Sequence, residues 1–331
     1  MEYRQLGDSD VKVSAVICGT WAIGGWMWGG TDEADAVAAI GKAIDSGMTS
    51  IDTAPIYGMG ISEQIVGRAI AGRRDEVQVL TKYCLRWDCT DGDPYFETVT
   101  PAGEAVKVYK NARPDSIVVE CERSLKRLGI DCIDVYQCHW RDVTTPVEMT
   151  MEAMERLLKA GKIRAAGVSN FTAEEIAAGR KVVPIASNQP PYSMVRSDIE
   201  ADVLPYCRDN GVGVIVYSPL QLGLLTGKVT MDRTFNGDDL RSSSPYFTPA
   251  NRRKVLAFLE DIRPIADAHN ATLAQLVIAW TIRRPGVTAA LVGARNPAQA
   301  AENAAGGDLK LTDDQTRRID ALLDKLKLDL E

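Results

Sequence analysis

Four residues of complementary chemistry follow apolar runs in the first half of the sequence. Asp52 and Tyr57 lie in MTSIDTAPIYGMG, Lys82 ends VLTK and His139 ends VYQCH. A phenol with an ordinary pKa near 10 holds its proton too firmly to act as an acid at neutral pH. A lysine ammonium favours the phenolate, so Lys82 would lower the pKa of Tyr57, and Asp52 would keep Lys82 charged and oriented. His139 would donate or share a hydrogen bond to an oxygen that gains charge, so the set suits general acid catalysis on a carbonyl.

Each of these residues also has an ordinary structural interpretation. Asp52 suits a turn cap, Lys82 a surface lysine, Tyr57 a half-buried loop aromatic, and His139 a core histidine satisfied by the backbone. Taken singly, each structural interpretation is the better one. Their joint position at three successive predicted strand ends favours a shared site instead. Reducing a carbonyl also needs a hydride that no side chain supplies, so the site predicts a nicotinamide cofactor.

The elements that would position these residues alternate β-branched runs with amphipathic helical stretches. After a predicted hairpin over residues 3–14, the predicted strands are SAVICG, MTSID, VQVLTK, CIDVYQCH, KIRAAGVS, VPIASN, GVGVIVYS and VTAALVG. Between them, DSIVVECERSLKRLG repeats apolar residues at helical spacing and stops at Gly129. This alternation predicts a (β/α)₈ TIM barrel that forms a single domain over residues 1–331. The active site of such a barrel lies at the C-terminal ends of its strands, where the candidate residues stand.

Two long irregular stretches, residues 85–112 and 219–250, predict covers over this C-terminal face. The first contains a predicted hairpin around PAGE, with Phe96 and Val108 on its arms, that would act as a lid determining specificity.

The predicted substrate pocket is aromatic. Its residues are Trp21, Tyr57, Trp87, His139 and Trp140. Such walls suit a sugar face and an apolar carbonyl compound equally. Trp26 and Trp28, in WMWGG, are interpreted as packing the loops on the barrel. No cluster of basic residues near Tyr57 indicates a phosphorylated sugar, although Arg86 and Arg141 leave that class open.

Composition excludes several classes of protein. A formal charge of −7 argues against nucleic acid as a partner, because phosphate binding requires a basic face. No apolar run has transmembrane length, and MEYRQLGDSD lacks a signal-peptide core, so we expect a cytoplasmic protein without a membrane partner. The 7 cysteines form no C-x-x-C pair and suit small buried residues in a reducing compartment. With only His139 and His269, no metal site is expected. Mixed charge on the predicted helices favours a monomer.

Several segments resemble the aldo-keto reductases, in order and across essentially the whole chain. They are YRQLGDSDVKVS, GT at residues 19–20, IDTAPIYGMGISEQIVGRAI, TK, SLKRLGIDCIDVYQCHW, GKIRAAGVSNF, YSPLQLGLLTGK and LVGARNPAQAAEN. The resemblance is closest to the bacterial branch of inositol-operon and general-stress reductases, which also resembles the potassium-channel β subunits. It implies a catalytic tetrad of Asp52, Tyr57, Lys82 and His139, with Tyr57 as the general acid.

The same resemblance implies a cofactor extended across the barrel mouth, whereas the usual dinucleotide fingerprint is absent. The implied contacts on the first strands are Gly19, Thr20, Trp21 and Asp52. Those that would fix the nicotinamide are Ser169, Asn170, Gln189 and, stacked under its ring, Tyr217. Those along the pyrophosphate are Ser218, Pro219, Leu220, Gln221, Gly223, Lys228 and Arg241. Those after the last strand are Gly293, Arg295, Gln299, Glu302 and Asn303.

The residues after the last strand bear on the choice of cofactor. A helix N-terminus suits a phosphate, and Arg295 can clamp a 2′-phosphate through two hydrogen bonds, which favours NADPH (NADP⁺) over NADH. Gln299 and Asn303, one helical turn apart, would contact the adenine, although a solvated helix face is their ordinary interpretation. One arginine can also bind the pyrophosphate of NADH.

The predicted function is therefore NADPH-dependent reduction of an aldehyde or ketone, with sugars and keto-sugars among the candidates and alcohol oxidation as the reverse reaction. A nicotinamide-sensing regulatory subunit with little turnover is an alternative that the channel-subunit resemblance permits. A barrel isomerase or lyase without a nicotinamide is a third, and the filled cofactor motifs stand against it.

Overall fold

The computed structural model describes residues 1–28, 30–235 and 239–330. Within these residues, a closed barrel of parallel strands runs in the order β10-β11-β12-β13-β3-β4-β5-β9. The strands are β3 (Val16–Gly19), β4 (Ser50–Asp52), β5 (Gln78–Tyr83), β9 (Ile133–Cys138), β10 (Ile163–Ser169), β11 (Ile185–Gln189), β12 (Gly213–Tyr217) and β13 (Ala289–Gly293). The predicted (β/α)₈ barrel is confirmed, and each predicted strand is present. The single-domain organisation of residues 1–331 stays a prediction.

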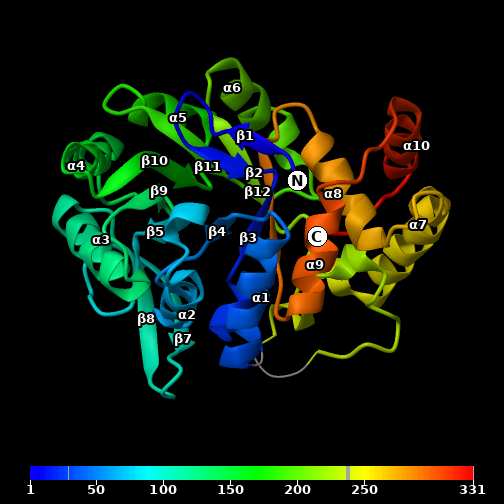
Figure 1. Ribbon diagram of the computed structural model, residues 1–331, viewed down its shortest axis with the longest axis horizontal. Helices are drawn as coiled ribbons and strands as arrows, with labels where there is room; N and C mark the ends of the chain where they lie inside the picture. The colour runs from blue at the N-terminus through cyan, green and yellow to red at the C-terminus, as the bar shows by residue number, and fades with distance from the viewer. Residues whose placement is uncertain (29, 236–238, 331) are drawn as a thin grey trace.

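Helices surround the barrel (Figure 1). They are α1 (Glu33–Asp45), α2 (Ile61–Ile70), α3 (Pro114–Leu128), α4 (Val147–Lys159), α5 (Ala173–Gly179), α6 (Val203–Asp209), α7 (Pro249–Asp267), α8 (Leu273–Arg283), α9 (Pro297–Gly306) and α10 (Asp313–Leu323). Short 3₁₀ helices are η1 (Ala22–Gly24), η2 (Arg74–Glu76), η3 (Asp198–Glu200), η4 (Leu224–Thr226), η5 (Leu240–Ser242) and η6 (Pro245–Phe247). Helix α3 starts with proline, whose missing N–H needs no partner there, and ends at left-handed Gly129 as expected.

The barrel interior is apolar at one end and polar at the other. Its apolar cluster consists of Leu6, Val11, Val13, Ile17, Leu80, Val135, Ala165, Ala186, Ile215 and Ala289. Part of this cluster comes from the predicted N-terminal hairpin, β1 (Tyr3–Gln5) and β2 (Lys12–Ser14), which therefore plugs the N-terminal end of the barrel. Side chains two positions apart share a strand face, so Leu80 is followed by Lys82, and Val135 by Gln137, along the interior. The polar layer lies at the C-terminal end.

The cover within residues 85–112 is a small sheet. Strand β7 (Asp93–Val99) pairs antiparallel with β8 (Ala105–Lys110), and Phe96 lies opposite Val108 as predicted. Strand β6 (Leu85–Arg86) pairs with the other edge of β8. Figure 1 shows the β7–β8 hairpin on the opposite side of the barrel from the β1–β2 hairpin.

The cover within residues 219–250 contains the 3₁₀ helices η4, η5 and η6, and its residues 236–238 lie outside the described part of the chain. No helix among the described residues is long and apolar enough to cross a membrane. The cytoplasmic location and the monomeric state stay predictions.

Candidate active site

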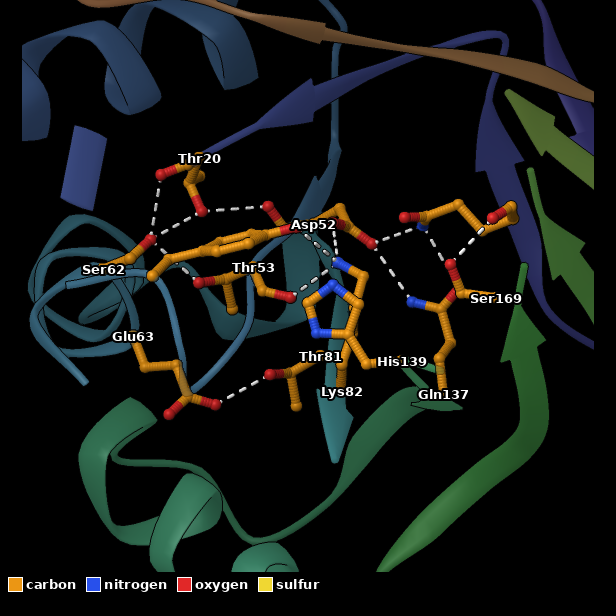
Figure 2. A network of polar contacts seen from close by, with 12 residues as sticks. Thr20, Asp52, Thr53, Ser62, Glu63, Thr81, Lys82, Gln137, His139 and Ser169 are labelled. Carbon is orange, nitrogen blue, oxygen red and sulfur yellow. Dashed lines mark hydrogen bonds and ion pairs between the residues drawn. The ribbon is translucent and has the colours of Figure 1, made fainter. Parts of the chain in front are cut away.

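The polar layer at the C-terminal strand ends is centred on Lys82. Its ammonium donates to the carboxylate of Asp52, to the carbonyl oxygen of Thr53 at 3.0 Å and to the hydroxyl oxygen of Tyr57 at 3.3 Å. Asp52 and Lys82 both have 0% exposure, so the surface interpretation of Lys82 is wrong. An ammonium has three donors, and these three acceptors use all of them, which fixes its position between Asp52 and Tyr57. Figure 2 shows this network at the strand ends.

Burial and charge together set the protonation of this pair. Burial opposes the charge of Lys82, but Asp52 and Tyr57 outweigh it and raise the lysine pKa above its usual 10.5. Burial raises the pKa of Tyr57, and Asp52 adds to this rise, while Lys82 acts in the opposite direction. The pKa of Tyr57 therefore lies above 10, and the predicted net lowering is wrong for this arrangement because burial outweighs the lysine. Tyr57 is thus a protonated donor at neutral pH, next to a cation that stabilises its phenolate.

His139 lies against the ring of Tyr57. The two rings meet edge to face, with centroids 5.8 Å apart. Burial, together with the charge of Lys82, lowers the pKa of His139 well below 6.5, so its imidazole is neutral at pH 7. A neutral imidazole keeps one N–H donor and one acceptor nitrogen. Its main chain is held on both sides, by a bond to Tyr83 and one from Asn170.

A pair of glutamine amides completes the environment of Asp52. Nε2 of Gln137 donates to Asp52 Oδ2 at 3.1 Å, and Nε2 of Gln189 donates to the same oxygen at 2.8 Å. Gln189 Nε2 also lies 3.2 Å from Gln137 Oε1. Gln137 is absent from the predicted site, although its place two residues before His139 on the inward face of VYQCH was a usable signal. The amide nitrogen of Gln189, an implied nicotinamide contact, is engaged by Asp52.

The implied contact Thr20 lies behind this layer. Its hydroxyl donates to the carbonyl oxygen of Asp52 at 2.9 Å and lies 2.7 Å from the hydroxyl of Ser62. Ser62 in turn lies 2.9 Å from the hydroxyl of Thr53. Gly19 is the register partner of Asp52 on the adjoining strand. These contacts fix the start of the loop that carries Tyr57.

The residues implied to hold the nicotinamide also come together. Ser169 donates to the carbonyl oxygen of Gln189 at 2.7 Å, and Asn170 Nδ2 lies 3.0 Å from the Ser169 hydroxyl. The hydroxyl of Tyr217 donates to Asn170 Oδ1 at 2.9 Å, so strands β10, β11 and β12 contribute to one cluster. Asn170 and Ser218 have left-handed φ angles of 61° and 57°, a costly conformation that is common at functional sites.

The side chains of the second cover have protein partners. Gln221 Oε1 accepts from Ser193 at 2.9 Å, and Lys228 forms an ion pair of 2.8 Å with Glu302 on α9. This ion pair connects the cover to the last barrel helix. Leu220 packs against the main core, Pro219 is buried, and Gly223 has a left-handed φ of 90° with open space where a Cβ would lie.

Arg241 connects the same cover to the loop after β3. It pairs with Asp239 at 2.6 Å, and its guanidinium lies 5.3 Å from the ring of Trp28 and 4.4 Å from that of Phe235. Such stacking is typical of arginine, and Asp239 accepts from both Nε and Nη2 on one edge of the guanidinium. The interpretation of Trp28 as a packing residue agrees with this contact.

Arg295 points toward the same loop. Its guanidinium donates to the carbonyl oxygens of Trp28 at 3.3 Å and Gly30 at 2.7 Å. Its main-chain N–H donates to Gln299 Oε1 at 2.8 Å. Asn303 has 4% exposure and donates to the carbonyl oxygen of Gly293, so it does not belong to a solvated helix face, whereas Gln299 is exposed. Adenine contacts of both residues stay predictions.

The aromatic residues of the predicted pocket pack around Tyr57. The ring of Trp21 stacks on Tyr57 with a centroid distance of 6.2 Å, and Trp28 meets Trp21 edge to face. Trp87 and Trp140 pack with Tyr57 in one apolar cluster at the base of the first cover.

Trp26 attaches the first cover to the barrel. Its indole N–H donates to the hydroxyl of Thr98 on β7 at 2.9 Å, and its ring stacks on Phe96 at 6.0 Å. The preceding residue, Tyr95, has its ring centroid 5.6 Å from that of Trp140. The hairpin thus packs against the aromatic cluster around Tyr57, and the interpretation of Trp26 as a packing residue agrees with these contacts. Residue 29 of the same WMWGG run lies outside the described residues.

The donor set at the mouth fits an extended nicotinamide dinucleotide. Amide and hydroxyl groups gather at β10 and β11, an aromatic ring ends β12, and basic side chains lie beside the N-terminus of α9. The backbone of Gly223 and Gly293 leaves space for a close approach, because among the described residues, the chain neighbours of each glycine aside, no atom lies closer than 3.9 Å to an added Cβ.

The closed barrel, together with the candidate catalytic side chains gathered at the C-terminal ends of its strands, is typical of an oxidoreductase built on a (β/α)₈ barrel. The chain belongs to the aldo/keto reductase family, whose model matches residues 15–324. It is accordingly an NAD(P)H-dependent oxidoreductase, and the family resemblance of the sequence is confirmed.

Individual relatives support this assignment. The chain is 42% identical to aldo-keto reductase YhdN of Bacillus subtilis over 302 residues, which cover 90% of this chain and 86% of that protein. It is 38% identical to the NADH-specific methylglyoxal reductase of Escherichia coli over 319 residues, 95% of each chain.

Solved structures agree with the same fold. The glycerol dehydrogenase AKR11B4 of Gluconobacter oxydans superposes with a TM-score of 0.88 at 38% identity, covering 98% of this chain and 95% of that one. The thermostable aldo-keto reductase Tm1743, in complex with the inhibitor epalrestat, superposes with a TM-score of 0.74 at 28% identity, covering 97% of this chain and 100% of that one.

Proposed function

We propose that this chain reduces an aldehyde or ketone with NADPH and that Tyr57 is the general acid. The observation that carries the proposal is the buried contact of 3.3 Å between the Lys82 ammonium and the Tyr57 hydroxyl, with Asp52 on the far side of the lysine. A bound nicotinamide supplies the hydride.

The side chains provide the rest of the chemistry. Tyr57 gives its proton to the carbonyl oxygen, and Lys82 stabilises the phenolate that remains. Asp52 keeps Lys82 charged and oriented. The neutral imidazole of His139 donates or shares a hydrogen bond to the same carbonyl oxygen, where charge develops in the transition state.

The cofactor roles follow the residues gathered at the mouth. Ser169, Asn170 and Gln189 hold the carboxamide of the nicotinamide, and Tyr217 stacks under its ring. Gln189 takes this role through its side-chain amide oxygen, Oε1, since its amide nitrogen, Nε2, is bonded to Asp52. The remaining cofactor contacts are those already described in the two loops that follow β12 and β13.

The preference for NADPH rests on Arg295. A guanidinium at the start of α9 can form two hydrogen bonds to a 2′-phosphate after exchanging its present bonds to the carbonyls of Trp28 and Gly30. NADH is the competing choice, because the methylglyoxal reductase relative is named as NADH-specific.

We propose a small carbonyl compound as the substrate. Two relatives are named for small oxygenated compounds, methylglyoxal and glycerol, and the pocket walls are aromatic. The basic residues that left phosphorylated sugars open are engaged elsewhere: Arg86 bonds Asp88 and Ser116, and Arg141 bonds the carbonyl oxygens of Asp142 and Thr145. This favours an uncharged aldehyde, ketone or keto-sugar.

A screen of aldehydes, ketones, sugars and keto-sugars with both cofactors tests the proposal. We expect NADPH oxidation by wild type and, for Tyr57→Phe, a loss of about 10²- to 10⁴-fold, the usual contribution of a general acid. NADPH affinity, measured by fluorescence quenching, should stay nearly unchanged, because only the proton donor is removed. Wild-type rates in Tyr57→Phe would refute the assignment. Tight NADPH binding without any turnover would favour a nicotinamide-sensing subunit.

A further inference from the structure

The carboxylate of Asp52 is held from two sides in the barrel interior. Oδ1 accepts from Lys82, and Oδ2 accepts from the amides of Gln137 and Gln189. Gln137 has 0% exposure and Gln189 has 2%, so water does not replace either donor. Figure 2 shows Gln137 reaching Asp52 beside Lys82, which is its register partner on the adjacent strand β5.

The hydrogen bonds fix which way the amide of Gln137 points. Its nitrogen faces the carboxylate of Asp52, and its oxygen accepts from Gln189 Nε2 at 3.2 Å. The reverse orientation would place an amide oxygen against a carboxylate oxygen and an amide nitrogen against the donor of Gln189. Both pairs would be repulsive in a site without water. Gln137 therefore acts on Asp52 as a donor.

Resting on the proposed function, we infer that Gln137 is a positioning residue of the reduction, which holds the carboxylate of Asp52 turned toward Lys82. A hydrogen bond from a neutral donor to a carboxylate favours its charged form. Lys82 depends on that charge to remain an ammonium next to Tyr57. The effect of Gln137 thus reaches the proton donor through two intervening side chains.

The other titratable groups that face Asp52 do not replace this donor. They are Cys18 on β3, Tyr57 in the loop after β4 and Lys82 on β5, while His139 after β9 faces Lys82. Lys82 already occupies Oδ1, and its other donors are used by Thr53 and Tyr57. Loss of Gln137 therefore leaves Oδ2 with Gln189 as its remaining amide donor.

Two substitutions at this position test the inference. Gln137→Leu removes the donor, and we expect kcat to fall about 10- to 100-fold, the range of a hydrogen bond to a charged group. In Gln137→Glu the new carboxyl is a donor when protonated, so kcat relative to wild type should recover as the pH falls. Two adjacent carboxyls resist joint ionisation, which keeps that proton bound.

Gln78→Leu is the matched control. Gln78 begins β5 at the opposite end of the strand from the active site and accepts hydrogen bonds from Thr49 and Ser50. We expect this variant to keep the wild-type kcat and pH profile even if it melts at a lower temperature. Substrate KM should change less than about twofold in Gln137→Leu, since Gln137 acts on the proton donor through Asp52.

A measurement without turnover separates this inference from the proposed function. In protein labelled with ¹⁵N-lysine, the buried Lys82 ammonium should give a slowly exchanging signal, assigned by its absence in Lys82→Met. We expect the signal in wild type and Gln78→Leu, and its loss in Gln137→Leu. Unchanged kcat and an unchanged lysine signal in Gln137→Leu would overturn the inference, as would parallel pH profiles for the two Gln137 variants. A wild-type enzyme without turnover would overturn the proposed function alone, because the lysine signal still reports on Gln137.

Discussion

The strand ends and the two covers hold their side chains in different ways. At the strand ends, Asp52, Lys82 and Gln137 have 0% exposure and bond to one another and to neighbouring strands. In the covers, the contacts include an ion pair between Lys228, 65% exposed, and Glu302, aromatic stacking, and the hydrogen bonds of Trp26 and Gln221. Exposed ion pairs contribute about 0–1 kcal/mol and a typical hydrogen bond about 0.5–1.5 kcal/mol, so these contacts can open at little cost. Proton transfer thus depends on the strand ends, which are fixed. Selection of cofactor and substrate depends on the two covers, which can open away from the barrel.

Removing the cation of each region gives the largest expected contrast. Lys82→Met should lower kcat about 10²- to 10⁴-fold and the free energy of unfolding by about 3–5 kcal/mol, because Asp52 then keeps a buried charge without its cation. The matched variant Lys228→Met should lower the free energy of unfolding by about 1 kcal/mol at most. Denaturant titration and steady-state NADPH oxidation measure both. Similar losses in the two variants would contradict the division into a fixed and an opening region.

The second largest effect concerns the cofactor side of the covers. Arg295→Ala should weaken NADPH binding about 10- to 100-fold, the range of hydrogen bonds to a charged group, and leave NADH binding nearly unchanged. Fluorescence quenching with each cofactor measures the ratio. Arg241→Ala is the control, since a contact to the pyrophosphate should affect both cofactors equally. Equal losses of NADPH and NADH affinity in Arg295→Ala would mean that Arg295, like Arg241, contacts the pyrophosphate.

The two regions also differ in how far the sequence predicts them. The strand-end residues were predictable because Asp52, Lys82 and His139 each interrupt an apolar run at the point where a buried strand ends. The hairpin was predictable because its alternating arms pair locally. Gln137 was missed because a neutral amide carries no charge that marks its role, although its inward place two residues before His139 was a signal.

Tertiary contacts decide the remaining differences. The sequence places Lys82 beside Tyr57, but the net direction of the tyrosine pKa depends on burial, which no spacing reveals. Likewise, the bond from Trp26 to Thr98 joins residues 72 positions apart. Neither residue type nor local pattern distinguishes this contact from packing against the barrel.

That bond supplies the third prediction, on the substrate side of the covers. Trp26→Phe keeps the stacking on Phe96 and removes the donor to Thr98, so the hairpin should close less firmly. A typical hydrogen bond contributes about 0.5–1.5 kcal/mol, so we expect KM for the best carbonyl substrate to rise about 2- to 10-fold with kcat nearly retained. Trp280→Phe is the control, because it also loses an indole bond, to Asp320, but lies on α8 outside the mouth. A loss confined to kcat in Trp26→Phe would place the hairpin in the chemical step.

The smallest expected effect is that of pH on kcat, whose profile should be flat. It tests most directly whether the strand ends are fixed. The pKa of His139 is lowered well below 6.5, so its neutral form persists at pH 6.5 and above, and protonation begins only at lower pH. The pKa values of Tyr57 and Lys82 are raised above 10.0 and 10.5, so both keep their protons throughout the neutral range. With saturating cofactor, kcat for reduction should therefore change less than about twofold between about pH 6.5 and pH 9. This range lies between the ordinary pKa values of histidine and tyrosine.

A step near pH 6.5 would mean that a histidine titrates in the working enzyme. His269, the other histidine of the chain, bonds Gln315 away from the mouth, so His269→Gln identifies the source. If the step survives in that variant, it belongs to His139, and the active site is wetter in the working complex than burial of that imidazole indicates. The strand ends would then open together with the covers, and the contrast between the two regions would not hold.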